Sequence, residues 1–188
     1  MEKKEARRQI ARSLESLTPA ERADKSAAIR RSVLAMPEFV RAETIMAFLS
    51  LPDELDTRPI IEAALAAGKR VCVPRTFVSE RRMTPVVLRD IHALRPGQYG
   101  ILEPDSNETV PPGAIDFILV PARAFDWRGN RLGRGGGFYD RFLDSQAPQA
   151  VRCGVAFACQ ILDAAPHDAH DLPVNALVTE GETIRFTR

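Results

Sequence analysis

Cysteine is scarce in this 188-residue sequence, and its three copies, Cys72, Cys153 and Cys159, stand singly. None has a second cysteine or a histidine at the spacing of a strong zinc motif. An odd number of isolated cysteines also argues against a disulfide framework. Cys72 and Cys153 fall inside apolar runs, where cysteine usually packs as a small core residue rather than acting as a catalytic thiol. We therefore expect no disulfide and no cysteine chemistry.

Long hydrophobic runs and an excess of one charge are missing as well. No segment approaches a membrane span, and residues 1–8 are charged rather than apolar like a secretory signal. The 26 lysines and arginines nearly balance the 25 aspartates and glutamates, so the formal net charge is +1. This balance gives no reason to expect non-specific binding to nucleic acid or to a membrane. We expect a cytoplasmic protein with neither partner, folded as one domain over residues 1–188, because 45% hydrophobic content can bury one core.

Glycine is sparse over most of the chain, but five of the 11 glycines fall in residues 129–141, which read GNRLGRGGGFYDR. This glycine segment follows an apolar, strand-like run at 116–121 and precedes a helical pattern. Glycines let the backbone approach a ligand, free amides at a helix start bind anions, and arginines add fixed positive charge. Loops at the carboxyl ends of strands are also where open α/β sheets bind ligands. The segment predicts a polyphosphate site, with Asp140 placed to hold a cation beside it.

Two better-known phosphate motifs do not fit this segment. No Lys-Ser or Lys-Thr follows the last glycine, which excludes a P-loop, and Phe138 stands where the third glycine of a dinucleotide-binding motif would be. A flexible loop rich in arginine and glycine is the plain alternative. The strand before the segment and its aromatic-Tyr-Asp ending favour the phosphate site.

The remaining pattern predicts an α/β fold with a mostly parallel sheet flanked by helices. Thr18 and Glu21 have the spacing of a capping box, with Pro19 at the first helical position. A strand, a helix and a second strand between residues 44 and 74 favour a parallel βαβ unit. We expect helices at residues 3–17, 19–36, 57–65 and 137–143, a helical turn at 38–42, strands at 44–49, 70–74, 86–88, 116–121, 153–157 and 176–179, and loops at 52–56 and 99–104.

Five stretches along the chain carry a resemblance to a known family: Lys3-Lys4-Glu5-Ala6-Arg7, Leu49-Ser50 with Asp53-Glu54, Pro74-Arg75, Tyr99-Gly100-Ile101 with Glu103-Pro104, and the glycine segment. Together they resemble the 5-formyltetrahydrofolate cyclo-ligases, also called methenyltetrahydrofolate synthetases. The resemblance covers nearly the whole chain, and the glycine segment is its most specific part. It implies an α/β fold related to the glucosamine-phosphate isomerase, ribose-phosphate isomerase and CoA-transferase group. It also implies ATP- and Mg²⁺-dependent closure of 5-formyltetrahydrofolate to 5,10-methenyltetrahydrofolate, with release of ADP and phosphate.

The resemblance assigns roles to residues by their positions in the sequence. Without it, Lys3 and Arg7 would be a solvated helix end, Arg75 a strand-end or surface ion pair, and residues 53–56 an acidic loop. A carboxylate at position 54 suits the donor edge of a pterin, and apolar or aromatic side chains can cover its ring. The resemblance implies that ATP is bound by Lys3, Lys4, Arg7, Arg75, Arg131, Leu132, Gly133, Arg134, Gly135, Gly136, Gly137, Phe138 and Tyr139, that folate is bound by Leu49, Glu54 and Tyr99, that Mg²⁺ is held by Asp140 and Asp171, and that Arg134 and Tyr139 are catalytic.

Three positions depart from the family pattern. Ala6 stands where leucine is usual, Phe138 where tyrosine is usual, and Asn175 where aspartate is usual. These changes predict weaker packing under the first helix, one hydroxyl fewer in the ATP loop, and no direct metal role for position 175. Residues 166–175 also hold two histidines and two aspartates, but their spacing matches no strong zinc motif, and Mg²⁺ prefers oxygen ligands.

A formyl group on nitrogen is a poor electrophile, and the family mechanism removes this obstacle by phosphorylation. The formyl oxygen attacks the γ-phosphate of ATP, the folate N10 then closes the ring, and phosphate leaves. The protein has to align two substrates and neutralise phosphoryl oxygens, so no nucleophilic side chain is required. The sequence contains no convincing Ser/His/Asp or Cys/His set, in agreement with this. We expect a monomer acting on two small molecules.

Three other functions stay open. A non-catalytic relative could bind folate or nucleotide only, and the three departures keep this alternative open. An RNA-binding protein could use the glycine segment, although interleaved aromatics and a basic balance are lacking. A sugar-phosphate isomerase or CoA-transferase could share the fold, because a fold does not fix a chemistry. ATP turnover with and without 5-formyltetrahydrofolate separates a binding module from the cyclo-ligase.

Overall fold

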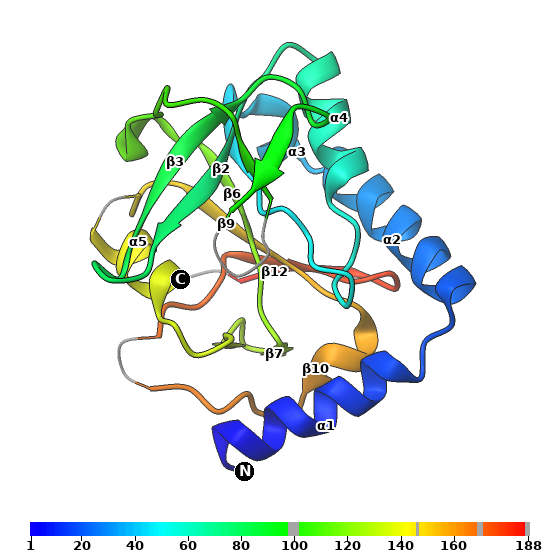
Figure 1. Cartoon of the computed structure of the whole chain (residues 1–188). Helices are drawn as coiled ribbons and strands as arrows, with labels where there is room; N and C mark the ends of the chain where they lie inside the picture. The colour runs from blue at the N-terminus through cyan, green and yellow to red at the C-terminus, as the bar shows by residue number, and fades with distance from the viewer. Residues whose placement is uncertain (98–101, 146, 169–170, 187–188) are drawn as a thin grey trace.

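A seven-stranded sheet forms the centre of the computed structural model, which describes residues 1–97, 102–145, 147–168 and 171–186. Its strands are β1 (Thr44–Met46), β2 (Arg70–Phe77), β3 (Arg82–Leu88), β6 (Phe117–Val120), β9 (Val151–Val155), β11 (Ala176–Val178) and β12 (Thr183–Arg185). They lie in the order β12-β11-β9-β6-β1-β2-β3 (Figure 1). β11, β9, β6, β1 and β2 are parallel to one another, and β12 and β3 add antiparallel edges. The prediction of an α/β fold with a mostly parallel sheet is confirmed.

Helices cover both faces of this sheet. The α-helices of the described residues are α1 (Lys3–Glu15), α2 (Pro19–Leu34), α3 (Pro37–Arg41), α4 (Arg58–Ala66) and α5 (Phe138–Ser145). α2, α3 and α4 lie together on one side, α5 lies on the other, and α1 runs below them (Figure 1). No helix in the described ranges is long and apolar enough to cross a membrane.

Smaller elements complete the chain around the sheet. They are the strands β4 (Leu94–Pro96), β5 (Leu102–Pro104), β7 (Ala124–Asp126), β8 (Arg131–Leu132) and β10 (Ile161–Leu162), and the 3-10 helices η2 (Pro112–Ala114) and η3 (Ala158–Gln160). β4 and β5 form an antiparallel pair, and β10, β7 and β8 form a second small sheet.

Alternation along the parallel strands divides the core into two layers. Ile45 and Leu119 point into the layer shared with α2, α3 and α4, whereas Met46 and Ile118 point into the layer shared with α5. All four side chains are at most 1% exposed. Fully burying such a side chain contributes about 1.5–3 kcal/mol to folding, so near-continuous apolar strands are expected in a sheet covered on both faces.

Several local predictions are confirmed. Thr18 and Glu21 form the capping box: the Glu21 amide donates to Thr18 Oγ1 at 3.2 Å, and the Thr18 amide donates to Glu21 Oε2 at 2.9 Å. The helix ends at Leu34 rather than residue 36, and the turn predicted at 38–42 is α3. The strand, helix and strand between residues 44 and 74 form the expected parallel unit, with Ile45 opposite Val71.

The hairpin of β2 and β3 is more extensive than predicted. β2 was expected to end at Pro74 and only residues 86–88 of β3 were expected, yet the two strands pair from Val71–Leu88 to Phe77–Arg82. Proline does not end β2 because β1 pairs with it only as far as Cys72, so beyond that point β2 is paired on one side. Residues 102–104, expected in a loop, form β5.

The glycine segment is not one continuous loop after the strand at 117–120. β7, a turn and β8 come first, and only residues 133–137 form the loop that enters α5. The Asp126 carboxylate closes the turn by accepting hydrogen bonds from the amides of Arg128 and Asn130, at 2.9 and 3.0 Å. Arg131 is therefore held in a strand rather than in a free loop.

Candidate active site

A cleft of about 930 Å³ opens at the carboxyl ends of the parallel strands β1, β2 and β6. Its walls come from the start of α1, the segment after β1, the far half of β2, the glycine segment and residues 168–171. Such a crevice is the usual ligand site of an open α/β sheet. Its volume is near the upper end of the range of roughly 300–1,000 Å³ that is typical of ligand sites, so it has room for two substrates.

The inner end of the cleft is an ionic cluster of Lys3, Arg131, Asp140, Asp168 and Asp171, in which Arg131 is buried and Asp168 is exposed. Arg131 Nη2 pairs with Asp140 Oδ1, and Arg131 Nε donates to the Leu172 carbonyl at 3.1 Å. Lys3 Nζ lies 2.7 Å from Asp168 Oδ2 and 2.9 Å from Asp171 Oδ2. The cluster thus joins α1, β8, α5 and the segment before β11.

Burial and pairing shift the titration of this inner cluster. Burial lowers the pKa of the Arg131 guanidinium against the opposing charges of Asp140 and Asp171, but arginine stays a cation. For Asp171, burial raises the pKa, and the Lys3 hydrogen bond and charge outweigh it, so the pKa lies below its ordinary value. Burial also lowers the pKa of Lys3, yet its two carboxylate partners raise it on balance. Lys3, Arg131 and Asp171 are therefore charged near neutral pH.

The outer end of the cleft is formed by Asp53, Glu54, Arg123 and Arg134, and here the arginine of the glycine segment, Arg134, is partly exposed. Arg134 Nη2 lies 2.7 Å from Glu54 Oε1 and 3.1 Å from Asp53 Oδ1. The other Asp53 oxygen pairs with Arg123, and Glu54 Oε2 accepts from the Leu51 amide at 3.0 Å. The acidic loop and the glycine segment therefore meet directly across the cleft.

The loop between these two ends needs its glycines. Gly135 and Gly137 have φ of +108° and +64°, conformations that a side chain makes unfavourable. A Cβ at Gly136 would also lie 2.7 Å from the Phe138 ring. Arg7 on α1 closes over the loop, because its Nε donates to the Gly133 carbonyl at 2.9 Å. The backbone of residues 133–137 and the guanidinium groups of Arg7 and Arg134 therefore line the same cleft.

Tyr139 has an unusual environment at the start of α5. Its hydroxyl oxygen is buried and has no hydrogen-bond partner among the described residues, although the side chain lines the cleft. Burial raises the pKa of this phenol, and the Glu54 charge raises it further. Buried polar groups are nearly always paired. An unpaired donor at the wall of an open cleft is suited to a ligand oxygen.

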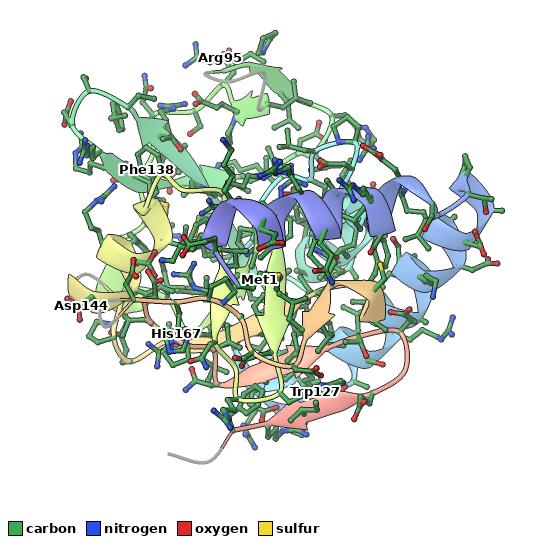
Figure 2. The ribbon with its side chains drawn as sticks, turned by 90° about the horizontal axis from the view of Figure 1, so that it is seen from below. Met1, Arg95, Trp127, Phe138, Asp144 and His167 are labelled. Atoms are coloured by element: carbon green, nitrogen blue, oxygen red, sulfur yellow. The ribbon has the colours of Figure 1, made fainter. Side chains whose placement is uncertain are left out.

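The structure brings most of the predicted site residues together. Besides the residues above, Leu49, Leu132 and Phe138 line the same cleft. Figure 2 shows the molecule from the side of α1, with Met1 labelled at the start of the chain and Phe138 labelled at the start of α5. Tyr99, predicted to bind folate, lies outside the described residues.

Two predicted ATP ligands are not part of the cleft wall. Lys4 is exposed on α1. Arg75 turns away and donates to Glu103 Oε2 at 3.1 Å, to Asn107 Oδ1 at 3.2 Å and to the carbonyls of Pro104 and Ser106 at 2.8 Å. Its donors are used by residues 103–107, the end of β5 and the segment after it, and Arg75 does not line the cleft.

Cys72, Cys153 and Asn175 lie in the packed structure outside the cleft wall. Burial raises the pKa of the Cys72 thiol to about 12 and also raises that of Cys153, which agrees with core packing rather than with nucleophiles. Asn175 lies by β9, where its Oδ1 accepts from the Arg152 amide at 2.8 Å. Among the described residues, no three His, Cys, Asp or Glu side chains gather as a metal cluster.

The sequence reasoning missed several residues of the cleft. Arg123, the partner of Asp53, follows β6 by three positions and had no motif to mark it. Met83, Leu102 and Glu103 line the cleft from the hairpins β2–β3 and β4–β5. Only the arrangement of these hairpins over the carboxyl edge of the sheet brings them to the site.

Comparison with known proteins gives a consistent match over the chain. A model of the 5-formyltetrahydrofolate cyclo-ligase family matches residues 1–180. The chain is similar to 5-formyltetrahydrofolate cyclo-ligase of Escherichia coli K12, with 32% identity over 87% of this chain and 92% of the relative. It is 31% identical to the mouse enzyme of the same name over 95% of this chain and 93% of the relative. The NMR structure of Aquifex aeolicus 5,10-methenyltetrahydrofolate synthetase is 32% identical, with a TM-score of 0.87 over 100% of this chain and 94% of that one.

Proposed function

The chain belongs to the 5-formyltetrahydrofolate cyclo-ligase family, and we propose that it closes 5-formyltetrahydrofolate to 5,10-methenyltetrahydrofolate while converting ATP to ADP and phosphate. The observation that carries this proposal is the convergence of four cationic side chains and a glycine loop on a cleft whose opposite wall holds Glu54. Such a site suits one polyphosphate and one heterocycle with hydrogen-bond donors.

The reaction begins at the formyl oxygen. This oxygen attacks the γ-phosphorus, the bond from γ-phosphorus to the bridging oxygen breaks, and ADP leaves. The formyl carbon is then activated, N10 attacks it, and the carbon–oxygen bond breaks as phosphate departs. N10 loses its proton, and the five-membered ring is complete. The protein aligns the substrates and stabilises the charge on the transferred group.

We assign the phosphates of ATP to Lys3, Arg7, Arg131, Arg134 and the amides of residues 133–139. Guanidinium groups and a helix start with free amides both favour phosphate oxygens. Lys4 and Arg75 are left out of this set, because Lys4 is exposed and Arg75 is used by residues 103–107.

Arg134 has to exchange partners during binding. In the ligand-free cleft it is held by Glu54 and Asp53, but a triphosphate offers more negative charge than either carboxylate. ATP binding would draw Arg134 towards the phosphates and leave Glu54 free to accept hydrogen bonds from the pterin. Leu49 supplies apolar surface on the same wall. This exchange couples the two substrates, so ATP strengthens folate binding and folate strengthens ATP binding.

Tyr139 is proposed as a catalytic residue because its buried hydroxyl lacks a partner. With its pKa raised by burial, the phenol keeps its proton and acts as a hydrogen-bond donor. Donation to a formyl or phosphoryl oxygen in the cleft would stabilise the charge that develops there.

The residues at the inner end fit Mg²⁺. Asp140 and Asp171 each keep one carboxylate oxygen without a hydrogen bond among the described residues. Mg²⁺ needs only one or two carboxylates when phosphates and waters supply its other ligands. When bound, the ion would neutralise negative charge on the phosphates of ATP. Asp140 and Asp171 are the residues that would hold it.

The purified protein tests this function directly. Mixed with ATP, Mg²⁺ and 5-formyltetrahydrofolate, it should produce the absorbance band of methenyltetrahydrofolate, with one ADP released for each ring closed. ATP should not be turned over without the folate. Binding of both compounds without product would instead identify a non-catalytic relative.

Three broader properties complete the proposal. We propose a cytoplasmic location, because the free thiols of Cys72, Cys153 and Cys159 are typical of a reducing compartment. We also propose that residues 1–188 act as one domain and as a monomer, since the cleft is assembled from a single chain. Cell fractionation and light scattering test these points.

A further inference from the structure

A second cavity of about 320 Å³ adjoins the active-site cleft. Met83 and Phe138 line both spaces, so the two are neighbours that share part of a wall. The second cavity lies between the turn that joins β2 to β3 and the helix α5. Figure 2 shows the labelled Phe138 and Asp144, both from its lining, on the same side of the molecule.

Basic side chains dominate this cavity. Arg81, Arg82 and Arg141 line it together with the carboxylates Glu80 and Asp144. Glu80 is paired with Arg82 at 2.8 Å, so it neutralises one arginine. The Arg81 side chain has no partner among the described residues and is exposed. The cavity therefore has positive charge to offer an anion.

Backbone strain at Arg81 is a second, independent observation. Arg81 has φ of +48°, and it is the only residue other than glycine with positive φ in the part of the chain that the structure describes. Its amide donates to the Val78 carbonyl at 3.1 Å, which closes the turn at a position that glycine or asparagine usually takes. Strained residues of this kind concentrate at ligand sites. Arginine at this position projects a cation at the cavity at the cost of an unfavourable backbone conformation.

Arg141 fixes the wall between the two spaces. Its Nε donates to the Arg81 carbonyl at 2.9 Å, its Nη2 donates to the Gly136 carbonyl at 2.7 Å, and its guanidinium lies 5.5 Å from the Phe138 ring centre. The turn that carries Arg81 is thus attached to the glycine segment. A ligand that spans the cleft and the second cavity would contact the β2–β3 turn and the glycine segment, which Arg141 links by hydrogen bonds.

The position of the second cavity indicates which of the two substrates extends into it. The phosphate-binding side chains Lys3, Arg7 and Arg131 belong to the cleft only and do not line the cavity. The shared wall next to the cavity is the apolar Met83 and Phe138, which suits the aryl part of a folate rather than a phosphate chain. Beyond its aryl ring, 5-formyltetrahydrofolate ends in glutamate, with two carboxylates.

We propose that the second cavity is the subsite for the glutamate carboxylates of the folate substrate and that Arg81 is the principal cation of that subsite. This assignment rests on the proposed function. The pterin lies in the cleft near Glu54, the aryl ring passes Met83 and Phe138, and the glutamate ends at Arg81. Arginine donors match carboxylates well, so loss of the Arg81 guanidinium weakens the binding of folate and not the binding of ATP.

The test compares two substrates, 5-formyltetrahydrofolate and 5-formyltetrahydropteroate, which lacks the glutamate. The measured quantity is the kcat/KM for 5-formyltetrahydrofolate divided by the kcat/KM for 5-formyltetrahydropteroate. Arg81→Gly relieves the backbone strain while removing the cation, so its Tm should equal or exceed that of the wild type. We expect the ratio to fall about five- to tenfold in Arg81→Gly, which is the size of one ordinary hydrogen bond and suits a cation at an exposed position. KM for ATP should not change.

Two further variants sharpen this result. Arg81→Lys keeps the charge and should retain most of the preference for the glutamate-bearing substrate. Arg128→Ala removes an exposed arginine from the turn between β7 and β8, which does not line the cavity, and should leave the ratio unchanged. An unchanged ratio in Arg81→Gly, or a rise in KM for ATP instead of folate, would overturn the subsite. If the wild-type protein closed neither substrate, the proposed function itself would be wrong, which is a separate outcome.

Discussion

The two ends of the active-site cleft use the same pairing at different depths. At the inner end the Arg131 side chain is 3% exposed and lies against Asp140, whereas at the outer end Arg134, three residues later, is 40% exposed and lies against Glu54 and Asp53. Removing one partner of a buried pair leaves an uncompensated buried charge, which strongly destabilises the fold. An exposed pair contributes little to stability and can exchange partners. The comparison indicates that the Arg131 pair at the inner end is fixed, whereas Arg134 at the outer end can change partners.

Asp140→Asn should give the largest effect, because it removes both the counter-charge of buried Arg131 and a proposed Mg²⁺ ligand. We expect kcat/KM for ATP to fall about 10³-fold and the free energy of unfolding to fall by about 2–3 kcal/mol. Steady-state kinetics and urea unfolding measure the two quantities. Asp168→Asn is the matched control, since that carboxylate is 72% exposed and its loss should change stability by less than about 0.5 kcal/mol. Equal stability of the two variants would show that burial does not raise the contribution of the Arg131–Asp140 pair above that of an exposed pair.

Arg134→Ala should separate activity from stability at the outer end. We expect kcat/KM for ATP to fall about 10²-fold, as for loss of one donor to a developing anion. Stability should fall by less than about 1 kcal/mol, because the pair is partly solvated. A variant that unfolds as readily as Asp140→Asn but keeps its ATP kinetics would show that Arg134 is structural.

Glu54→Gln should affect the two substrates in opposite directions. KM for 5-formyltetrahydrofolate should rise about tenfold, because the pterin loses a charged acceptor. ATP should bind two- to threefold more tightly in calorimetry without folate, since Arg134 is no longer held by the carboxylate; that change is about 0.5 kcal/mol. If folate affinity and turnover stayed at wild-type values, the folate role of this loop would be wrong.

Asp53→Asn should give the smallest effect, and one that depends on pH. Burial raises the pKa of Asp53, but Arg123 and Arg134 outweigh it and hold the pKa below its ordinary value. The ionised form therefore stabilises the fold at pH values above the ordinary pKa of about 3.9, and this stability is lost as the pH falls through the lower folded-state pKa. In urea unfolding at pH 7, the free energy of unfolding of the wild type should exceed that of Asp53→Asn by less than about 1 kcal/mol. This difference should close as the pH falls through the folded-state pKa of Asp53. A gap that stayed constant with pH would assign the effect to packing.

Local signals explain which parts of the fold could be predicted. The apolar runs around Ile45 and Ile118 and the capping box at Thr18 depend on residues close in sequence, and they were predicted correctly. The β7–β8 hairpin was missed because the glycine segment was predicted to be one loop. The Asp126 carboxylate closes a turn at its start, and Arg131–Leu132 then form a strand. The extension of β2 past Pro74 depends on where β1 stops pairing, which the sequence of β2 does not contain.

The amino-acid sequence by itself determined the layered sheet and predicted a phosphate site at residues 129–141, because period, glycine content and charge are local properties. The partners of that segment were decided by the tertiary structure. Arg131 is buried against residues from α5 and the segment before β11, Arg134 meets a loop 80 positions earlier, and Arg75 turns to residues 103–107 instead of the cleft. The direction of an arginine side chain depends on which distant carboxylates and carbonyls the fold brings within hydrogen-bond distance, and only the packing of the strands and helices fixes that.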